Sequence, residues 1–490
     1  MIPPLGVGLV YWPALEELFQ PGAAAPDVLE LEPQTAWELV HDAGGWRYRS
    51  NESLLERVAA LPQRKLLHGV GNPLGGTVAD RFDPVPPLRH AVCRLDPVWI
   101  SEHLSFNRVR RGMQVEHAGF LLPPAQTPAS VHVAAGCIDA MRRTLGRPVA
   151  FETGVNYLRP RRDELDDGAF FAAVADGADS GILLDLHNLW CNQRNGRQSV
   201  AEALSQLPLQ RVWELHLAGG MAHGNAWLDA HCGAVPDEVL DIASALLPRL
   251  PNLGAIVFEI LPEHLASIGL DGVQRQIEQL HRLWRQRPAP VRELRARRQA
   301  LDRPLRPDAA QRAEVAAWEL ALVDAIGGAA LPGGPTLALE PSRDPGCAVY
   351  RELIVDLRKA NLARALHYTM TALLATLGAD GTQALLDAYL GGQPPEPFAA
   401  LEADAFAGFL RTRADRLPAV PGFADVLAFE HALVRATTHG ESCELELNTD
   451  PVQLFEALDA GVMPKHPCAV PNRLRIEAAA MVQHALPAMP

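Results

Sequence analysis

Eight short apolar segments alternate with longer amphipathic stretches through the first 288 or so residues, and this alternation restricts the fold more than any other feature. The segments are rich in Val, Ile and Leu, and they do not alternate with polar residues as a half-exposed strand would. Such runs are typical of parallel strands covered on both faces, so the pattern predicts a TIM-type (β/α)8 barrel. The absence of a GxGxxG motif after the first segment disfavours an open doubly wound sheet. The segments are residues 6–12, 27–33, 65–71, 97–106, 147–154, 180–189, 212–219 and 254–261, and the clearest helical stretches are residues 128–145, 235–249 and 263–285.

The composition changes after the eighth segment. Arg and Pro dominate residues 287–312, which is typical of a linker or a solvated basic helix. Leucines at helical spacing follow after residue 347, and residues 442–450 alternate like a strand, either an ordinary interior strand, which we favour, or an edge open to an added peptide. We therefore predict a barrel domain over 1–288, a linker and connecting helix over 289–345, and a smaller, mainly helical domain over 346–490.

Charge and cysteine content exclude several classes of partner. The formal net charge is −14, so the average field repels nucleic acid. No run approaches the roughly 18 apolar residues of a membrane span, and the first residues have no basic segment typical of a secretory signal. The seven cysteines form no CxxC pair. We expect a reduced, cytoplasmic protein that binds neither nucleic acid nor a membrane.

Ionisable side chains gather at the carboxyl ends of the predicted strands, which meet at one mouth of a (β/α)8 barrel. So many carboxylates and imidazoles in one place would suffer desolvation and repulsion without a positive charge, which metal cations supply. Imidazole and carboxylate ligands without a thiolate suit iron, zinc or manganese, and their number suits two or three ions. Glu102 and Glu214 either support ligands or face the helices. The candidate ligands are His68, His103, Glu152 (a possible bridge), Asp185, Asn188, His216, Asp229, His231 and Glu259.

The segments that carry these residues resemble the multinuclear non-heme iron-dependent oxidases, within the xylose-isomerase-like barrel superfamily. They are HGVGNPLGG (68–76), SEHLSF (101–106), FLLPPAQT (120–127), FETGVNYL (151–158), ILLDLHNLW (182–190), ELHLAGG (214–220), LDAH (228–231) and FEI (258–260). The resemblance implies that the candidate ligands bind iron, and that Asp185, His187 and Asn188 take part in catalysis. This chain departs from the family at His187, where Asn is usual, and at Gly220, where His is frequent, so the roles of His187 and of nearby His223 stay open.

The residues from about 360 to 437 are similar to the partner protein that accompanies such oxidases. That similarity implies an enzyme fused to its own peptide-recognition domain, which would hold the leader of a ribosomally made precursor peptide. The implied reaction is O2-dependent oxidation of that peptide, and we expect cysteine to be the modified residue. The residues themselves leave alternatives open: a metal-dependent phosphodiesterase or endonuclease-like hydrolase, a sugar isomerase on the same barrel, or a protein that only binds peptide or stores metal.

Overall fold

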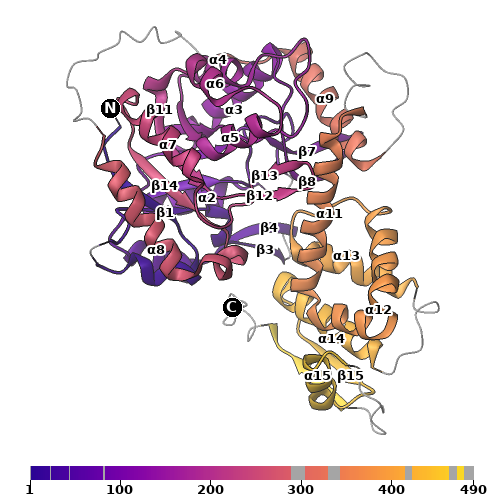
Figure 1. The fold of residues 1–490 in the computed structure, drawn as a ribbon. Coiled ribbons are helices and arrows are strands. Elements are labelled where there is room, and N and C mark those ends of the chain that lie inside the picture. The colour runs from indigo at the N-terminus through magenta and orange to yellow at the C-terminus, as the bar shows by residue number, and fades with distance from the viewer. Residues whose placement is uncertain are drawn as a thin grey trace. The chain divides into compact units, whose positions relative to one another are not determined.

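The computed structural model describes residues 2–22, 24–42, 45–80, 83–287, 304–328, 343–413, 422–462 and 472–478. The chain forms two compact units (Figure 1). The first contains residues 1–37, 50–115 and 121–349, and the second contains residues 38–49, 116–120 and 350–490. The second unit therefore takes in two short segments from the N-terminal half. Most of the predicted linker, 289–345, lies outside the described residues.

The first unit is built on a closed barrel of eight parallel strands, as predicted. The order around the barrel is β1-β14-β11-β10-β9-β6-β5-β2, so strands that follow each other among these eight are neighbours in space. Each lies within one of the eight predicted apolar segments or overlaps it. The strands are β1 (Gly6–Val10), β2 (Val28–Leu31), β5 (Arg64–Gly69), β6 (Ile100–His103), β9 (Val149–Glu152), β10 (Gly181–Asp185), β11 (Val212–Ala218) and β14 (Ala255–Glu259).

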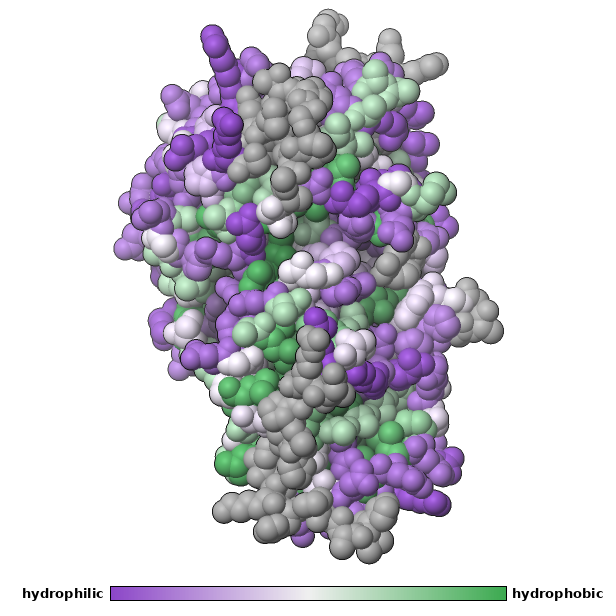
Figure 2. All heavy atoms as spheres, turned by 90° about the vertical axis from the view of Figure 1, so that its right-hand side faces the viewer, coloured by the Kyte–Doolittle hydropathy of each residue, from purple (hydrophilic) through white to green (hydrophobic). Residues whose placement is uncertain are grey.

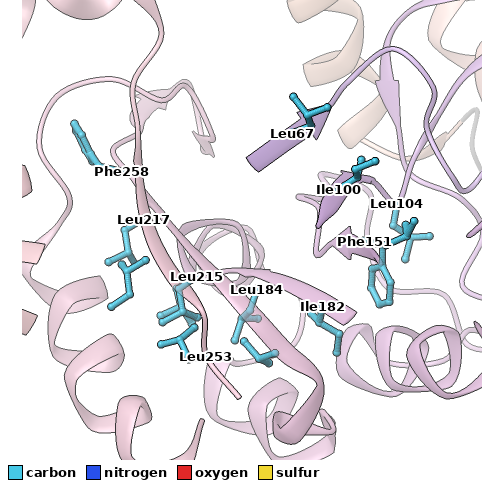
Figure 3. Close-up of a cluster of buried hydrophobic side chains, with 14 of the residues drawn as sticks. Leu67, Ile100, Leu104, Phe151, Ile182, Leu184, Leu215, Leu217, Leu253 and Phe258 are labelled. Atoms are coloured by element: carbon cyan, nitrogen blue, oxygen red, sulfur yellow. The ribbon is translucent and has the colours of Figure 1, made fainter. Parts of the chain in front are cut away.

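Side chains alternate between the barrel interior and the layer of helices. Outward residues such as Ile182 and Leu184 of β10 and Leu215 and Leu217 of β11 belong to the large apolar core (Figure 3). The inward residues form a smaller apolar cluster, which includes Trp99. Because both faces of each strand are covered, the strands contain few exposed residues.

The helices of the first unit carry ordinary start and stop signals. In α3 the Thr127 side chain accepts a hydrogen bond from the Ser130 amide, and Gly146 ends the helix at φ 64°. On α9, buried Glu319 accepts a hydrogen bond from the backbone N–H of Thr77 at 2.7 Å. These helices are α1 (Glu52–Ala60), α2 (Val85–Leu95), α3 (Pro128–Leu145), α4 (Asp167–Ala178), α5 (Leu186–Arg194), α6 (Val200–Gln206), α7 (Asp237–Leu246), α8 (Leu265–Trp284) and α9 (Ala309–Gly327).

Three hairpins interrupt the barrel pattern and were not predicted. Each is a two-stranded sheet of its own. The third hairpin lies in the connection that follows β11, next to the candidate residues Asp229 and His231. The hairpins are β3 (Trp37–Asp42) with β4 (Gly45–Ser50), β7 (Phe106–Arg111) with β8 (Gln114–Leu122), and β12 (Met221–His223) with β13 (Ala226–Leu228).

The second unit is mainly helical, and its own core includes Leu373, Tyr389, Phe406 and Leu410. The strand predicted over 442–450 is present as β15. It pairs only with β16 in the described part of the chain, so it is an edge strand and the interior-strand alternative is wrong. The elements are α11 (Gly346–Ala365), α12 (His367–Leu390), α13 (Ala399–Arg411), α14 (Phe423–His439), β15 (Cys443–Leu447), α15 (Pro451–Asp459) and β16 (Asn472–Ile476).

Hydrophilic and hydrophobic residues are mixed on the face drawn in Figure 2. Among the described helices, none combines the length and the apolar character that a membrane crossing requires.

Candidate metal centre

The carboxyl ends of the barrel strands bring the predicted residues together at one mouth. His68 ends β5 apart from one glycine, and Glu152 and Asp185 are the last residues of β9 and β10. Glu259 closes β14, while His216 lies two residues before the end of β11. None of these side chains is more than 4% exposed. Residues separated by up to 191 positions in the chain therefore come together, buried, at one end of the barrel.

Glu152 lies at the centre of one group of ligand atoms. Its Oε2 is 3.1 Å from Nε2 of His68 and 3.0 Å from Nε2 of His103. Its Oε1 accepts a hydrogen bond from the Asn188 amide at 3.0 Å. The other ring nitrogens are held by neighbours, since Nδ1 of His68 lies 2.9 Å from the Ser101 hydroxyl. Glu152 is therefore placed between two sets of donors, as a bridging ligand would be.

Glu259 has the corresponding place on the other side of the mouth. Its Oε2 is 3.0 Å from Nδ1 of His216, and its Oε1 is 3.1 Å from Nδ1 of His231. Asp185 joins this set, because ligand atoms of Asp185, His231 and Glu259 all lie within 4.8 Å of one another. His231 has φ +47°, a conformation that is uncommon outside glycine and that recurs at functional sites.

His187 and Asn188 lie on the first turn of α5 and not on a strand, which corrects the predicted segment 180–189. The strand stops at Asp185 because its carboxylate accepts a hydrogen bond from the Asn188 amide N–H at 2.7 Å and so begins the helix. His187 lies 2.9 Å, through Nδ1, from Oδ1 of Asp229. Its Nε2 accepts the indole N–H of Trp227 at 3.4 Å. Since indole is only a donor, His187 carries its proton on Nδ1 and orients Asp229.

The two departures from the family pattern lie against each other. A Cβ atom on Gly220 would be 2.6 Å from Cε1 of His187 and 2.3 Å from the carbonyl oxygen of Leu228. Both separations are far below van der Waals contact, so no side chain fits at position 220 while His187 has its present place. His223, in contrast, lies on β12, and its exposure is intermediate.

The electrostatics of the mouth favour a bound cation. Burial, followed by repulsion from Asp229 and Glu152, raises the pKa of Asp185 well above its usual range. Burial opposes ionisation of Glu259 too, but the charge of His231 and the hydrogen bond from His216 outweigh it and hold its pKa well below the usual range. Crowded carboxyls in such different states are typical of a site built around positive charge.

Unsatisfied atoms test whether the residues fit a metal. Nε2 of His68, Oε2 of Glu152, Oδ2 of Asp185, Oδ1 of Asn188 and Nε2 of His231 are buried and make no hydrogen bond within the described ranges. Buried polar atoms are seldom left without a partner. Nε2 of His68 lies 3.1 Å from Oε2 of Glu152, and Nε2 of His231 lies 3.1 Å from Oδ1 of Asp229. The donor set therefore fits transition-metal ions held by imidazole and carboxylate.

Three buried carboxylates were missed or left open by the sequence. Glu30 of β2 is 0% exposed, and its Oε1 is 2.8 Å from Nε2 of His216. Glu214 also points inward, whereas Glu102 lies outside the cavity, with its oxygens taken by the amide N–H groups of Asn72 and His103 at 3.0 and 3.1 Å. The sequence feature that could have revealed Glu30 is its position as a carboxylate within the apolar segment 27–33.

Comparison with known proteins places this site in a family. Residues 25–260 match the family model described as "RiPP precursor modification enzyme MbnB/TglH/ChrH", where RiPP denotes a ribosomally synthesised and post-translationally modified peptide. The chain is 31% identical over 191 residues to a UPF0276 protein of Acaryochloris marina, which is 39% of this chain and 68% of that relative. This chain belongs to that family. It is also 29% identical over 259 residues to a UPF0276 protein of Chromobacterium violaceum, 52% of this chain and 92% of that relative.

All candidate ligands of this MbnB/TglH/ChrH family member lie within the matched residues. Among solved structures, a xylose isomerase domain protein from Planctomyces limnophilus is 14% identical with a TM-score of 0.37, over 58% of this chain and 98% of that chain. The 3-keto-D-glucoside 4-epimerase YcjR of E. coli is 14% identical with a TM-score of 0.34, over 55% and 98%. The barrel fold rests on the strand order itself.

Proposed function

We propose that this protein is a multinuclear iron enzyme that uses O2 to modify a ribosomally made precursor peptide at a cysteine. Membership in a family of precursor modification enzymes supports the class of substrate. The proposed metal is supported by buried donor atoms that lie around Glu152 and Glu259 and that have no hydrogen-bond partner among the described residues. Two or three iron ions bound there would supply a site for the thiolate and for O2, and would lower the pKa of the thiol.

The protein's own residues have separable roles in this proposal. His68 and His103 with Glu152 would form one ligand set. Asp185, His231 and Glu259 would form a second. Asn188 contacts Glu152 and Asp229 contacts His231, so these two residues would complete the two sets. His216 contacts Glu259 through Nδ1. Six of these nine groups are buried, which excludes water from them and strengthens the electrostatic contacts between them, whereas His103, Asp229 and His231 are partly exposed.

Two of the candidate ligands, Asp185 and Asn188, and their neighbour His187 were the candidate catalytic residues. We keep Asp185 and Asn188 beside the reacting atoms, as metal ligands. The contacts of His187 with Asp229 and Trp227 favour a positioning role, because neither of its ring nitrogens is free to take a proton from a substrate.

The second unit is proposed to hold the leader of the peptide. Among the described residues β15 pairs only with β16, so its other edge is where an extended peptide would add. Fusion to the barrel would raise the effective concentration of the peptide at the mouth without any new contact. We place this reaction in the cytoplasm, where iron and thiols stay reduced.

The test uses full-length protein loaded with Fe(II) without oxygen and a Cys-bearing peptide encoded beside its gene. We expect a visible charge-transfer absorption on adding the peptide, and a change in peptide mass after O2 is admitted. Protein loaded with zinc is the control and should leave the mass unchanged. Cleavage of abasic DNA without oxygen would instead favour a hydrolase, and an unchanged peptide with loaded iron and O2 would refute the proposed oxidation.

A further inference from the structure

Inside the barrel, two more polar side chains meet the candidate ligand His216 of β11. They are Glu30 of β2 and Glu214 of β11, and all three residues are 0% exposed. The register pairs Glu30 with Leu66, which precedes His68 by two residues on the neighbouring strand. Since inward side chains recur every second residue, the group lies one layer deeper than His68.

The three side chains are spaced like ligands of one ion. Oε1 of Glu30 is 2.8 Å from Nε2 of His216, and Oε1 of Glu214 is 3.9 Å from the same nitrogen. One ligand atom from each residue lies within 4.8 Å of the other two. An ion that binds each atom at about 2.1 Å would hold the atoms roughly 3 to 4 Å apart.

These atoms also lack hydrogen-bond partners. In the described part of the chain, both carboxylate oxygens of Glu30, Oε1 of Glu214 and Nε2 of His216 make no hydrogen bond. The close contact between Glu30 and His216 thus has the distance of a hydrogen bond but not its geometry. The indole N–H of Trp99 donates to Oε2 of Glu214 at 2.8 Å, which leaves the facing oxygen unsatisfied. Carboxylates buried in this way need a compensating positive charge.

We propose that Glu30, Glu214 and His216 form a further cation-binding position on the floor of the metal centre. Two carboxylates and one imidazole suit a divalent ion such as iron, manganese or zinc. His216 presents Nδ1 to Glu259 at 3.0 Å, so its ring connects this position with the strand-end ligands. Binding requires an unprotonated Nε2 and ionised carboxyls, and the displaced protons go to solvent.

The competing occupant is a proton shared by the two carboxyls. Two carboxyls buried close together cannot both stay ionised without a cation, so a proton is the alternative to a metal ion. The two occupants predict opposite results when one carboxylate is replaced by an amide. A metal site loses a ligand and its ion, whereas a proton site loses only a proton and keeps every metal bound elsewhere.

The experiment counts metal in full-length protein. Metal-free wild type, Glu30→Gln, Glu214→Gln and Glu319→Gln are loaded with zinc without oxygen, passed through a desalting column and measured by mass spectrometry. We expect Glu30→Gln and Glu214→Gln each to hold one ion fewer than wild type. Glu319→Gln, a buried carboxylate on α9 outside the barrel, should hold the wild-type number.

Equal zinc content in wild type, Glu30→Gln and Glu214→Gln would overturn the proposal. If Glu30→Gln fails to fold, Glu30→Asp is titrated with zinc against a chelator, and it should bind the last ion at least tenfold more weakly. Wild-type affinity in that variant would overturn the proposal as well. Neither readout involves peptide or O2, so this position can fail while the proposed oxidation stands, and the reverse.

Discussion

Replacing Glu152 by alanine should remove more than one metal ion. Its two oxygens serve different neighbours, because Oε2 lies 3.0–3.1 Å from His103 and His68 while Oε1 contacts Asn188. Loss of one partner from a buried charged contact costs about 3–5 kcal/mol. At 1.4 kcal/mol per factor of ten, each ion that Glu152 holds should bind about two to four orders of magnitude more weakly.

The assay is zinc or iron content after anaerobic loading and desalting, with a chelator titration for affinity. Glu102→Gln is the matched control, since Glu102 is a buried carboxylate on the adjacent strand whose oxygens are taken by backbone N–H groups. We expect Glu152→Ala to lose two ions and Glu102→Gln to lose none. If Glu152→Ala retains the full wild-type metal content and affinity, the bridging role of Glu152 is wrong.

Three further changes test other parts of the first unit. Burial raises the pKa of Glu319 to about 7, against about 4.5 in the unfolded chain. The free energy of unfolding should therefore fall by about 3 kcal/mol as the pH rises from about 4.5 to about 7. Glu319→Gln should remove this pH dependence, which is measured as the difference between thermal midpoints at about pH 5 and about pH 8. A slope that persists in the variant would contradict this assignment. Gly220→Ala should destabilise the protein by about 1–3 kcal/mol. Adding His187→Ala should not restore stability, because the Leu228 carbonyl oxygen still blocks the new Cβ. An unchanged melting temperature in Gly220→Ala would refute the clash. His187→Asn should weaken one metal ion tenfold to hundredfold in a chelator titration, and unaltered affinity would remove its positioning role.

The barrel could be predicted because its signals are local. Each strand is a short run of β-branched and aliphatic residues, and the helices between them carry their own caps. The stretch 128–145 is an example, since α3 has those bounds, with Thr127 before it and Gly146 after it. Closure of the eight strands then follows from the handedness and shortness of the connections.

The parts that escaped prediction depend on contacts between distant segments. The segments 38–49 and 116–120 join the second unit although they lie inside the predicted barrel domain. The local sequence of these two segments does not indicate that they belong to the second unit. The sixth strand was predicted too long because Leu186 and Leu189 continue its apolar run, whereas the Asp185 carboxylate ends the strand by capping α5.

The alternation of side chains along a strand explains why Glu102 and Glu214 face different sides. Both precede a candidate histidine ligand, and the sequence alone left their roles equal. Glu214 is two residues before His216 and faces the same cavity, whereas Glu102 is one residue before His103 and faces the opposite side of its strand, where it binds the loop after β5.

The same alternation explains the position of Glu30 on β2. In β2 the outward residues Leu29 and Leu31 belong to the large core, so Glu30 between them must point into the barrel. A carboxylate in that place cannot reach water, and no sequence pattern for an apolar strand explains it. A charged residue flanked by outward aliphatic residues in a barrel strand therefore needs a partner inside the barrel. If Glu30→Leu, which fills the position with an apolar side chain, left both metal content and fold unchanged, this reading of β2 would be refuted.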